Sequence, residues 1–326
     1  MINIKNNSIW WIILVFSLFI SLFFASLFIG ISSITLIDLL LLDGFAWDIL
    51  LATRIPRTVA LILSGSSLAI AGVIFQSLTQ NKFVEPNTSG TTAAAALGLL
   101  ITLIFFPDIT ILGRILVTTI CALIGAFSFL IILQNLPLKN ALVVPLVGII
   151  FTSILNSIAT FIGYKFNLLQ SLLAWKTGDF ALILAGRYEL IWLTAIVCIF
   201  AYLFAHKFTI AGLGRNITEG LGVNYRVTVT LGIIMVSIIS ALTMTIVGSI
   251  PFVGLVIPNF VSLLLGDNLK KSLPIVALSG AILLLICDIL GRIIDYPYEI
   301  PIGTMMGVIG SGLFLIIILS QKKHVG

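Results

Sequence analysis

The chain has 326 residues, of which 60% are hydrophobic and 9% charged, with a formal net charge of +5 and a mean hydropathy of +1.25. Soluble domains carry roughly 25% charged residues, so this composition excludes a soluble protein and predicts an integral membrane protein. Apolar stretches of about 20 residues recur along the whole length and leave no room for a separate soluble domain. We therefore expect a single all-α, polytopic transmembrane domain over residues 1–326, with the lipid bilayer and no nucleic acid among its partners.

Ten membrane spans are expected in chain order. The first starts near Ile9 and lacks a cleavage site, so we interpret it as a retained span and exclude a signal peptide. The eighth is too short to cross as a simple helix and contains Pro258, which predicts a broken or re-entrant segment. The spans lie near Ile9–Gly30, Arg57–Leu78, Thr91–Phe106, Ile115–Leu133, Ala141–Ile162, Leu190–Ala205, Val227–Val247, Phe252–Leu265, Ser272–Leu290 and Ile302–Leu319.

The distribution of lysine and arginine predicts the orientation. Ten spans place both termini on one side of the membrane, and that side would hold ten of the 17 basic residues. Because cytosolic loops carry the excess of basic residues, we expect both termini to be cytosolic.

Two charged clusters fall on the opposite side of the expected topology. The run Arg54–Arg57 (RIPR) opens the second span, where proline suits a helix start and both arginines can face water. Acidic residues and Arg292 surround the connection Asp288–Glu299. Arginine at a span end is commonly an interfacial anchor. The alternative is that Arg54, Arg57 and Arg292 pair with carboxylates of an external protein, because arginine forms strong bidentate pairs.

The longest polar break is Gly212–Arg226, GLGRNITEGLGVNYR, within a loop over residues 206–226. Its charged residues cannot lie in lipid without a large cost, so the loop should be cytosolic. We expect a short helix at Asn216–Leu221 that stops at Gly222. The loop is either a plain connector or a docking surface for a cytosolic partner. The candidate contact residues are Asn216, Ile217, Glu219, Leu221 and Gly222.

Motifs for catalysis are missing from the sequence. It contains no GxxxxGK[ST], HExxH, GxSxG or EF-hand loop, so we expect no enzyme activity, no cofactor and no metal site. The cysteines Cys121, Cys198 and Cys287 lie in apolar runs without metal-ligand spacing. Isolated charges are also missing from the middle of the spans, which argues against an ion-coupled carrier. The source of energy for any transport should therefore lie outside this chain.

Six motifs point in order along the chain to one family. They are RIPRT at Arg54–Thr58, SGSSLAIAGVIFQ at Ser64–Gln76, NKFVEPNTSG at Asn81–Gly90, LGVN at Leu221–Asn224, GSIPFVGLVIP at Gly248–Pro258 and EIPIG at Glu299–Gly303. With them the chain resembles the FecCD family of ABC-importer permeases. It departs from the family pattern at Asn259, where histidine is usual, and at Lys82-Phe83, where proline and leucine are usual.

The resemblance implies a type II ABC importer permease with about ten transmembrane helices in a bacterial cytoplasmic membrane. Its implied partners are a cytosolic ABC ATPase dimer, a second permease subunit that is identical or paralogous, and an extracytoplasmic substrate-binding protein. Asn216–Gly222 would be the helix that couples to the ATPase. Arg54, Arg57 and Arg292 would face the binding protein, and Lys139, Asn140 and Ala141 would adjoin the inner gate of a path between the two permeases.

The expected cargo is an iron–siderophore complex, since that class is the commonest in the family. Asn259 favours a catecholate siderophore, and haem or cobalamin remains an alternative cargo. A stand-alone secondary carrier and a membrane enzyme or signalling subunit are further alternatives, which the missing mid-membrane charges and missing catalytic motifs respectively disfavour.

Overall fold

The computed structural model describes residues 8–30, 37–38, 44–136, 142–186 and 188–322, and in these ranges every regular element is a helix. The elements are α1 (Ser8–Phe28), α3 (Gly44–Ile49), the π-helical turn η2 (Leu50–Arg54), α4 (Ile55–Thr79), α5 (Thr91–Phe105), α6 (Ile111–Gln134), α7 (Val143–Lys165), α8 (Leu169–Thr177), the 3-10 turn η3 (Glu189–Ile191), α9 (Trp192–Leu203), α10 (Ala205–Ala211), α11 (Arg215–Gly220), α12 (Tyr225–Ile246), α13 (Val253–Leu265), α14 (Leu269–Ile293) and α15 (Ile302–Lys322).

Each of the ten predicted spans coincides with a helix. Six helical stretches of the described chain are long and apolar enough to cross a membrane by themselves. The pair Glu189–Leu203 and Ala205–Ala211, bent by 63°, makes a seventh candidate, and three shorter apolar helices remain at Ile13–Phe28, Thr91–Phe105 and Val253–Leu265. The structure therefore agrees with an all-α membrane protein of about ten segments, several of which are too short or too bent to cross alone.

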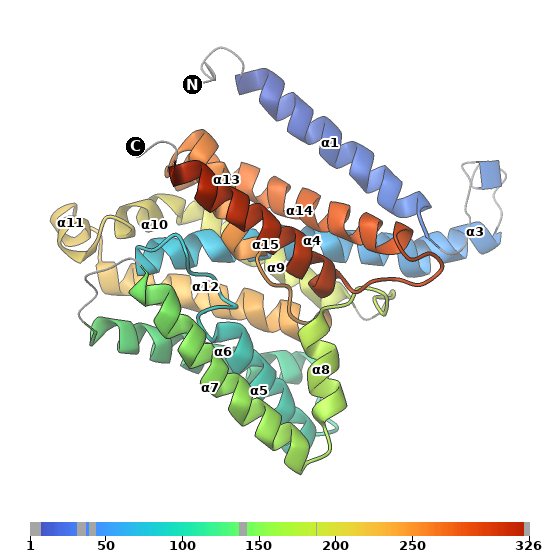
Figure 1. The fold of residues 1–326 in the computed structure, drawn as a ribbon, viewed down its shortest axis with the longest axis horizontal. Coiled ribbons are helices and arrows are strands. Elements are labelled where there is room, and N and C mark those ends of the chain that lie inside the picture. Colours follow the sequence, from blue (N-terminus) through green and yellow to red (C-terminus); the bar gives the residue numbers. More distant parts are fainter. Residues whose placement is uncertain (1–7, 31–36, 39–43, 137–141, 187, 323–326) are drawn as a thin grey trace.

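The helices are arranged around α4 and α14, which form the most extensive pair. Figure 1 shows α1 along the outer side of α14, and α5, α6 and α7 together on the far side of α12. The start of α1, the end of α15 and α11 lie at the left of the view, which we term the α11 end. The start of α4 and the end of α14 lie at the right, which we term the arginine end.

Small residues let α4 approach its neighbours closely. A Cβ on Gly65 would collide with the backbone of Gly280 in α14, and a Cβ on Gly72 would collide with the carbonyl of Gly254 in α13. Close backbone approach replaces the hydrophobic effect as a source of helix association in lipid, where the tails are as apolar as leucine. The glycines of α4 therefore explain why this helix occupies the centre of the molecule.

The second predicted span starts earlier than expected. The α-helix α4 does begin with Pro56 in its first turn, but α3 and η2 precede it without a break, so the helical stretch runs from Gly44 to Thr79. Proline has no N–H to offer the carbonyl four residues before it, here that of Ala52. That carbonyl instead accepts a hydrogen bond from the N–H of Ala185 over 2.9 Å. An outside partner thus lets the helix run through the proline.

Candidate functional sites

The arginine end contains a buried ion-pair network. Arg57 donates from Nη2 to Oδ1 of Asp288 and from Nη1 to Oε2 of Glu299, both over 2.7 Å. Arg292, one turn beyond Asp288 on α14, pairs with the other carboxylate oxygen of Asp288. Asp288 therefore joins two arginines, one from α4 and one from its own helix. We term Arg54, Arg57, Asp288, Arg292 and Glu299 the arginine cluster.

The same cluster holds the last turn of α1. Arg54 donates from Nη1 to the carbonyl oxygen of Ile29 over 2.6 Å. Arg292 donates from Nη1 to the carbonyl oxygens of Ser26 and Ile29 over 3.0 and 2.7 Å. The last carbonyls of a helix have no partner within it and carry its negative partial charge, so arginine is a favourable partner there. These bonds join α1 to α4 and α14.

The expectation that Arg54 and Arg57 face water is wrong. Arg54 is 8% exposed, Arg292 is 3% exposed, and the side chain of Arg57 is 13% exposed. They are covered because acidic side chains of α14 and its following loop, together with the end of α1, pack over them. Asp295, which follows α14, is exposed outside the cluster.

The predicted loop helix is present at the opposite end. It is α11, Arg215–Gly220, one residue earlier than expected. The residue before it, Gly214, has a φ of +98°. The hydroxyl of buried Thr218 donates to the carbonyls of Gly214 and Ile210, which fixes α11 on α10. Ile217 and Leu221 remain 52% and 59% exposed. The loop therefore offers two apolar side chains that no described part of the chain covers.

The chain leaves α11 by a sharp turn. Gly222 has φ +76°, and a Cβ there would meet nothing within 4 Å. The requirement for glycine at this position therefore comes from its backbone angle and not from crowding. Asn224 then caps α12 by accepting a hydrogen bond from the N–H of Val227 over 3.1 Å. The LGVN motif thus combines a left-handed turn with a helix cap.

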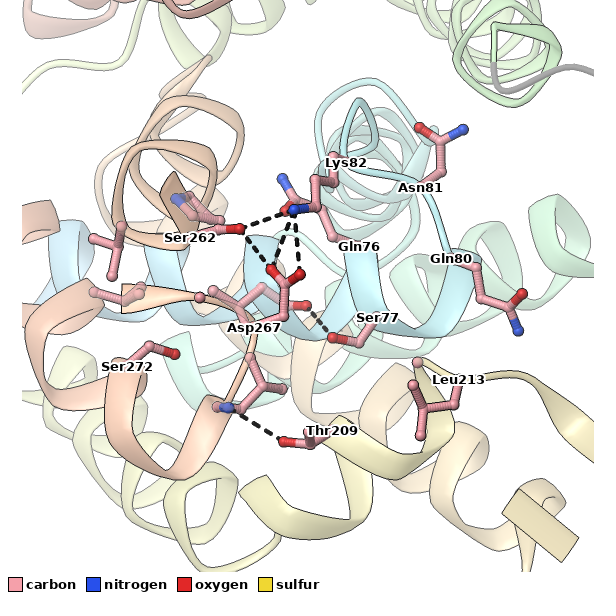
Figure 2. A pocket seen from close by; sticks show the side chains of 17 residues that line it. Gln76, Ser77, Gln80, Asn81, Lys82, Thr209, Leu213, Ser262, Asp267 and Ser272 are labelled. Atoms are coloured by element: carbon pink, nitrogen blue, oxygen red, sulfur yellow. Dashed lines mark hydrogen bonds and ion pairs between the residues drawn. The ribbon is translucent and has the colours of Figure 1, made fainter. Parts of the chain in front are cut away.

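A pocket of about 260 Å³ lies beside this loop, between the end of α4, α10 and the α13–α14 turn (Figure 2). On one side Lys82 donates to the hydroxyl of Ser262 over 2.9 Å and pairs with Asp267 over 3.2 Å. Partial burial acts to raise the pKa of Asp267, but hydrogen bonds from Ser262 and Lys82 outweigh it and hold this pKa below its usual value. The ion pair fixes the loop after α4 to the turn before α14.

On the other side of the pocket, α10 caps α14. The hydroxyl oxygen of Thr209 accepts a hydrogen bond from the N–H of Leu269 over 3.2 Å (Figure 2). Asn268, which precedes α14, makes no capping bond of its own side chain. The first turn of α14 is therefore satisfied by the helix that leads into α11. Because Thr218 of α11 binds the carbonyl of Ile210 in α10, α10 connects α11 to α14.

The NKFVEPNTSG and GSIPFVGLVIP motifs contact each other, which the sequence did not reveal. Glu85 is 2% exposed and accepts the N–H of Phe252 over 3.1 Å. Asn87 donates from Nδ2 to the carbonyl of Ile250 over 2.7 Å. A carboxylate in a polar stretch between two spans is normally solvated, whereas Glu85 is enclosed. A single sequence gives no signal for a pairing across more than 160 positions.

Asn259, the position that departs from the family pattern, belongs to the same interface. Its Nδ2 donates to the carbonyl of Lys82 over 2.8 Å and to that of Leu255, one turn earlier, over 2.7 Å. Asparagine supplies two N–H groups from one nitrogen, so both carbonyls are satisfied by one side chain. Asn259 therefore attaches α13 to the segment after α4. The predicted gate residues Lys139, Asn140 and Ala141 lie outside the described residues.

Comparison with solved structures identifies the architecture. The chain is similar to an inward-facing conformation of a metal-chelate type ABC transporter, with a TM-score of 0.80 at 24% sequence identity, over 94% of this chain and 97% of the other. A likeness at this identity shows the fold alone. It is the fold of a type II ABC importer permease, as the sequence predicted.

Comparison with known sequences identifies the family. The chain is 45% identical to the petrobactin import system permease protein YclN of Bacillus subtilis, over 95% of this chain and 98% of that protein. It is 41% identical to the ferric-anguibactin transport system permease protein FatD of Vibrio anguillarum, over 94% and 97%. The model of the FecCD transport family matches residues 13–320. The chain therefore belongs to the FecCD transport family.

Proposed function

We propose that this chain is the permease subunit of an ATP-driven importer that moves an iron–siderophore complex, of the catecholate-containing type, from an extracytoplasmic binding protein into the cytoplasm. The observation that carries the proposal is the near-complete mutual coverage with two siderophore permeases at 45% and 41% identity. ATP hydrolysis is assigned to a separate subunit. The protein would lie in a bacterial cytoplasmic membrane with both termini, and hence the α11 end, in the cytosol.

The ATPase is proposed to bind at α11. Exposed Ile217 of α11 and Leu221, the residue after it, are four residues apart and project from one side of this turn, whereas the Arg215–Glu219 ion pair lies on the opposite side. An exposed apolar pair suits a cleft on a cytosolic protein. Asn216 and Gly222 complete the contact, the first by its position in α11 and the second by setting the turn after it.

The binding protein is proposed to dock at the arginine end. Arg57 is the best placed of the three arginines for a direct contact, because part of its side chain reaches the surface. Arg54 and Arg292 would act from beneath, by holding the end of α1. A contact between Arg57 and a carboxylate of the binding protein would chiefly raise the rate of association.

A second permease subunit is proposed to complete the transport path. On α7 the hydroxyl residues Ser153, Ser157 and Thr160 recur at helical spacing, and all three are exposed in the single chain. Each donates to the carbonyl four residues earlier, so the stripe is compatible with a membrane environment. A polar stripe in a span is better suited to a path between subunits than to lipid. Lys139, Asn140 and Ala141, which precede α7 in the sequence, are the proposed inner gate region.

The test is reconstitution of the chain with its cognate ATPase and binding protein in proteoliposomes, with iron-loaded petrobactin as the cargo. We expect ATP-dependent accumulation of iron that needs all three proteins. Accumulation of haem or cobalamin without that of iron–petrobactin would replace the proposed cargo. Transport by the chain alone would instead identify a secondary carrier.

A further inference from the structure

The residues Gly248–Phe252, between α12 and α13, form a short non-helical segment that we term the strip. α13 has 13 residues, so at 1.5 Å per residue it extends roughly 20 Å, less than the roughly 30 Å of a hydrocarbon core. It ends at Leu265, close to the Lys82–Asp267 ion pair of the α11 end. The strip at its other end therefore lies within the thickness of the membrane, where its backbone needs partners from the protein.

Two other segments, α8 and the segment after α4, supply those partners. The N–H of Ser249 donates to the carbonyl of Trp175 over 2.8 Å. Asn87 donates to the carbonyl of Ile250 and accepts the hydroxyl of Ser249 over 3.2 Å. Glu85 accepts the N–H of Phe252. Two of the side chains that hold the strip thus come from the single segment that follows α4.

Phe252 has an unusual backbone that these contacts maintain. Its φ is +68°, a conformation that bulky side chains rarely adopt. Glu85 lies directly at this point and makes no ion pair with any residue that the structure describes. Its carboxyl group also lies beside Gly254, at the N-terminal end of α13, where the partial charge of the helix is positive. The hydrogen bond between Glu85 and the N–H of Phe252 therefore fixes the positions of both residues.

The opposite side of the strip rests against α15. A Cβ on Gly310 would lie 2.7 Å from that of Phe252, and one on Gly303 would lie 3.2 Å from the carbonyl oxygen of Ser249. The strip is thus enclosed between α15 and the segment that carries Glu85 and Asn87. Any shift in that segment must move the strip, since α15 leaves it no spare room on the other side.

Resting on the transport function proposed above, we propose that Glu85 and Asn87 are positioning residues for transport. They hold the strip, and the carbonyl of Asn87 also accepts the hydroxyl of Thr152 over 3.5 Å from α7, the helix whose hydroxyl stripe is proposed to line the path. Neither residue contacts the α11 loop or the arginine cluster. Substitutions at these two positions should therefore reduce the iron moved per ATP hydrolysed and leave assembly with the ATPase and binding protein intact. A residue with a merely structural role would lower assembly and transport together.

The experiment compares Glu85→Gln and Asn87→Asp in the reconstituted complex with iron-loaded petrobactin. Glutamine keeps the size of Glu85 but turns an amide N–H₂ towards backbone N–H groups, and aspartate removes the donor to Ile250. The matched controls are Glu189→Gln and Asn135→Asp. Both side chains are exposed and make hydrogen bonds to the backbone three or four residues away. We expect both test variants to assemble normally, to hydrolyse ATP within twofold of wild type, and to move at least tenfold less iron per ATP. The controls should match wild type.

A steric pair tests the position of the strip independently. Gly310→Ala should reduce the iron moved per ATP by pressing on Phe252. Phe252→Gly in the same chain removes the colliding atoms and tolerates the positive φ, so it should restore at least half of the lost transport.

The inference is overturned if both test variants keep wild-type transport per ATP, if their losses follow the loss of assembled complex, or if Phe252→Gly fails to rescue Gly310→Ala. A wild-type complex that moves no iron would overturn the transport function and the inference with it. If the wild-type complex transports iron and the Glu85→Gln and Asn87→Asp variants are fully active, the transport function stands and only the role of these two residues is overturned.

Discussion

Gln76 of α4 donates its side-chain amide to the carbonyl oxygen of Gly254 in α13, over 3.3 Å. Pro258 has no N–H, so this carbonyl, four residues before it, lacks its helical partner. The last residue of one family motif therefore completes the broken backbone of another. The pairing explains how α13 keeps a proline in its middle within a membrane, where an unsatisfied carbonyl is costly.

Replacing Gln76 with methionine should destabilise the protein without a large change in volume. The carbonyl of Gly254 would lose its donor, which costs about 1–3 kcal/mol when the group is buried. Equilibrium unfolding in detergent would measure the change in the free energy of unfolding. Gln134→Met, at the exposed end of α6, serves as the control, and equal effects of the two substitutions would contradict this role for Gln76.

Asp288→Asn should be among the most destabilising polar substitutions in the chain. Asp288 pairs with Arg57 and Arg292, and its side chain is 1% exposed. Removing one member of a buried ion pair costs about 3–5 kcal/mol, because it leaves a buried charge uncompensated. The same unfolding measurement applies, and exposed Asp295→Asn should change stability by less than about 0.5 kcal/mol. A small effect at Asp288 would mean that water reaches the cluster.

Leu221→Asp should weaken binding of the ATPase and leave the permease inserted and able to dock its binding protein. Burying a leucine-sized side chain is worth roughly 1.5–3 kcal/mol, so the affinity should fall about ten- to hundredfold. Binding of the purified ATPase to the permease in nanodiscs would measure this fall. Leu182→Asp, at an exposed leucine of the arginine end, should leave ATPase binding unchanged. Normal assembly and transport by Leu221→Asp would make the loop a plain connector.

Two neighbouring glycines separate backbone strain from side-chain bulk. Gly222 has φ +76°, whereas Gly220 is helical, and a Cβ at either would meet open space. Gly222→Ala should therefore weaken ATPase binding, because a left-handed alanine costs roughly 1–2 kcal/mol and the turn would relax. Gly220→Ala should have no such effect. Identical binding by the two variants would show that the turn angle is irrelevant to coupling.

Thr209→Val should loosen the joint between α10 and α14. It removes the hydroxyl that accepts the N–H of Leu269, and loss of such a cap costs about 0.5–2 kcal/mol. We expect a reduced stimulation of ATP hydrolysis by the loaded binding protein, with basal hydrolysis unchanged. Thr209→Ser, which keeps the hydroxyl, should behave as wild type. A wild-type response from Thr209→Val would place the connection to α14 elsewhere.

The sequence predicted the parts of this protein that depend on local pattern. Apolar runs located ten helices, Gly222 and Asn224 marked the turn after α11, and Pro258 marked the shortened α13. The parts that depend on distant partners could not be predicted. No local sequence pattern indicates that Arg54 and Arg292 bind carbonyls at the end of α1. The same is true of the contact between Glu85 and the start of α13. Charged residues next to a span are usually solvated, and only the packed helices show which of them are enclosed.

The bonds between Arg292 and the end of α1 also constrain the order in which the molecule is built. Ile29 leaves the ribosome 263 residues before Arg292 does. Arg54, which binds the same carbonyl, emerges much sooner. Arg54 can thus bind the end of α1 early in synthesis. The bonds from Arg292 can form only after almost the whole chain has entered the membrane. A nascent chain that stops before α14 would leave Arg57 without Asp288 and Glu299. An unpaired arginine at the membrane would therefore distinguish an incomplete chain from a complete one.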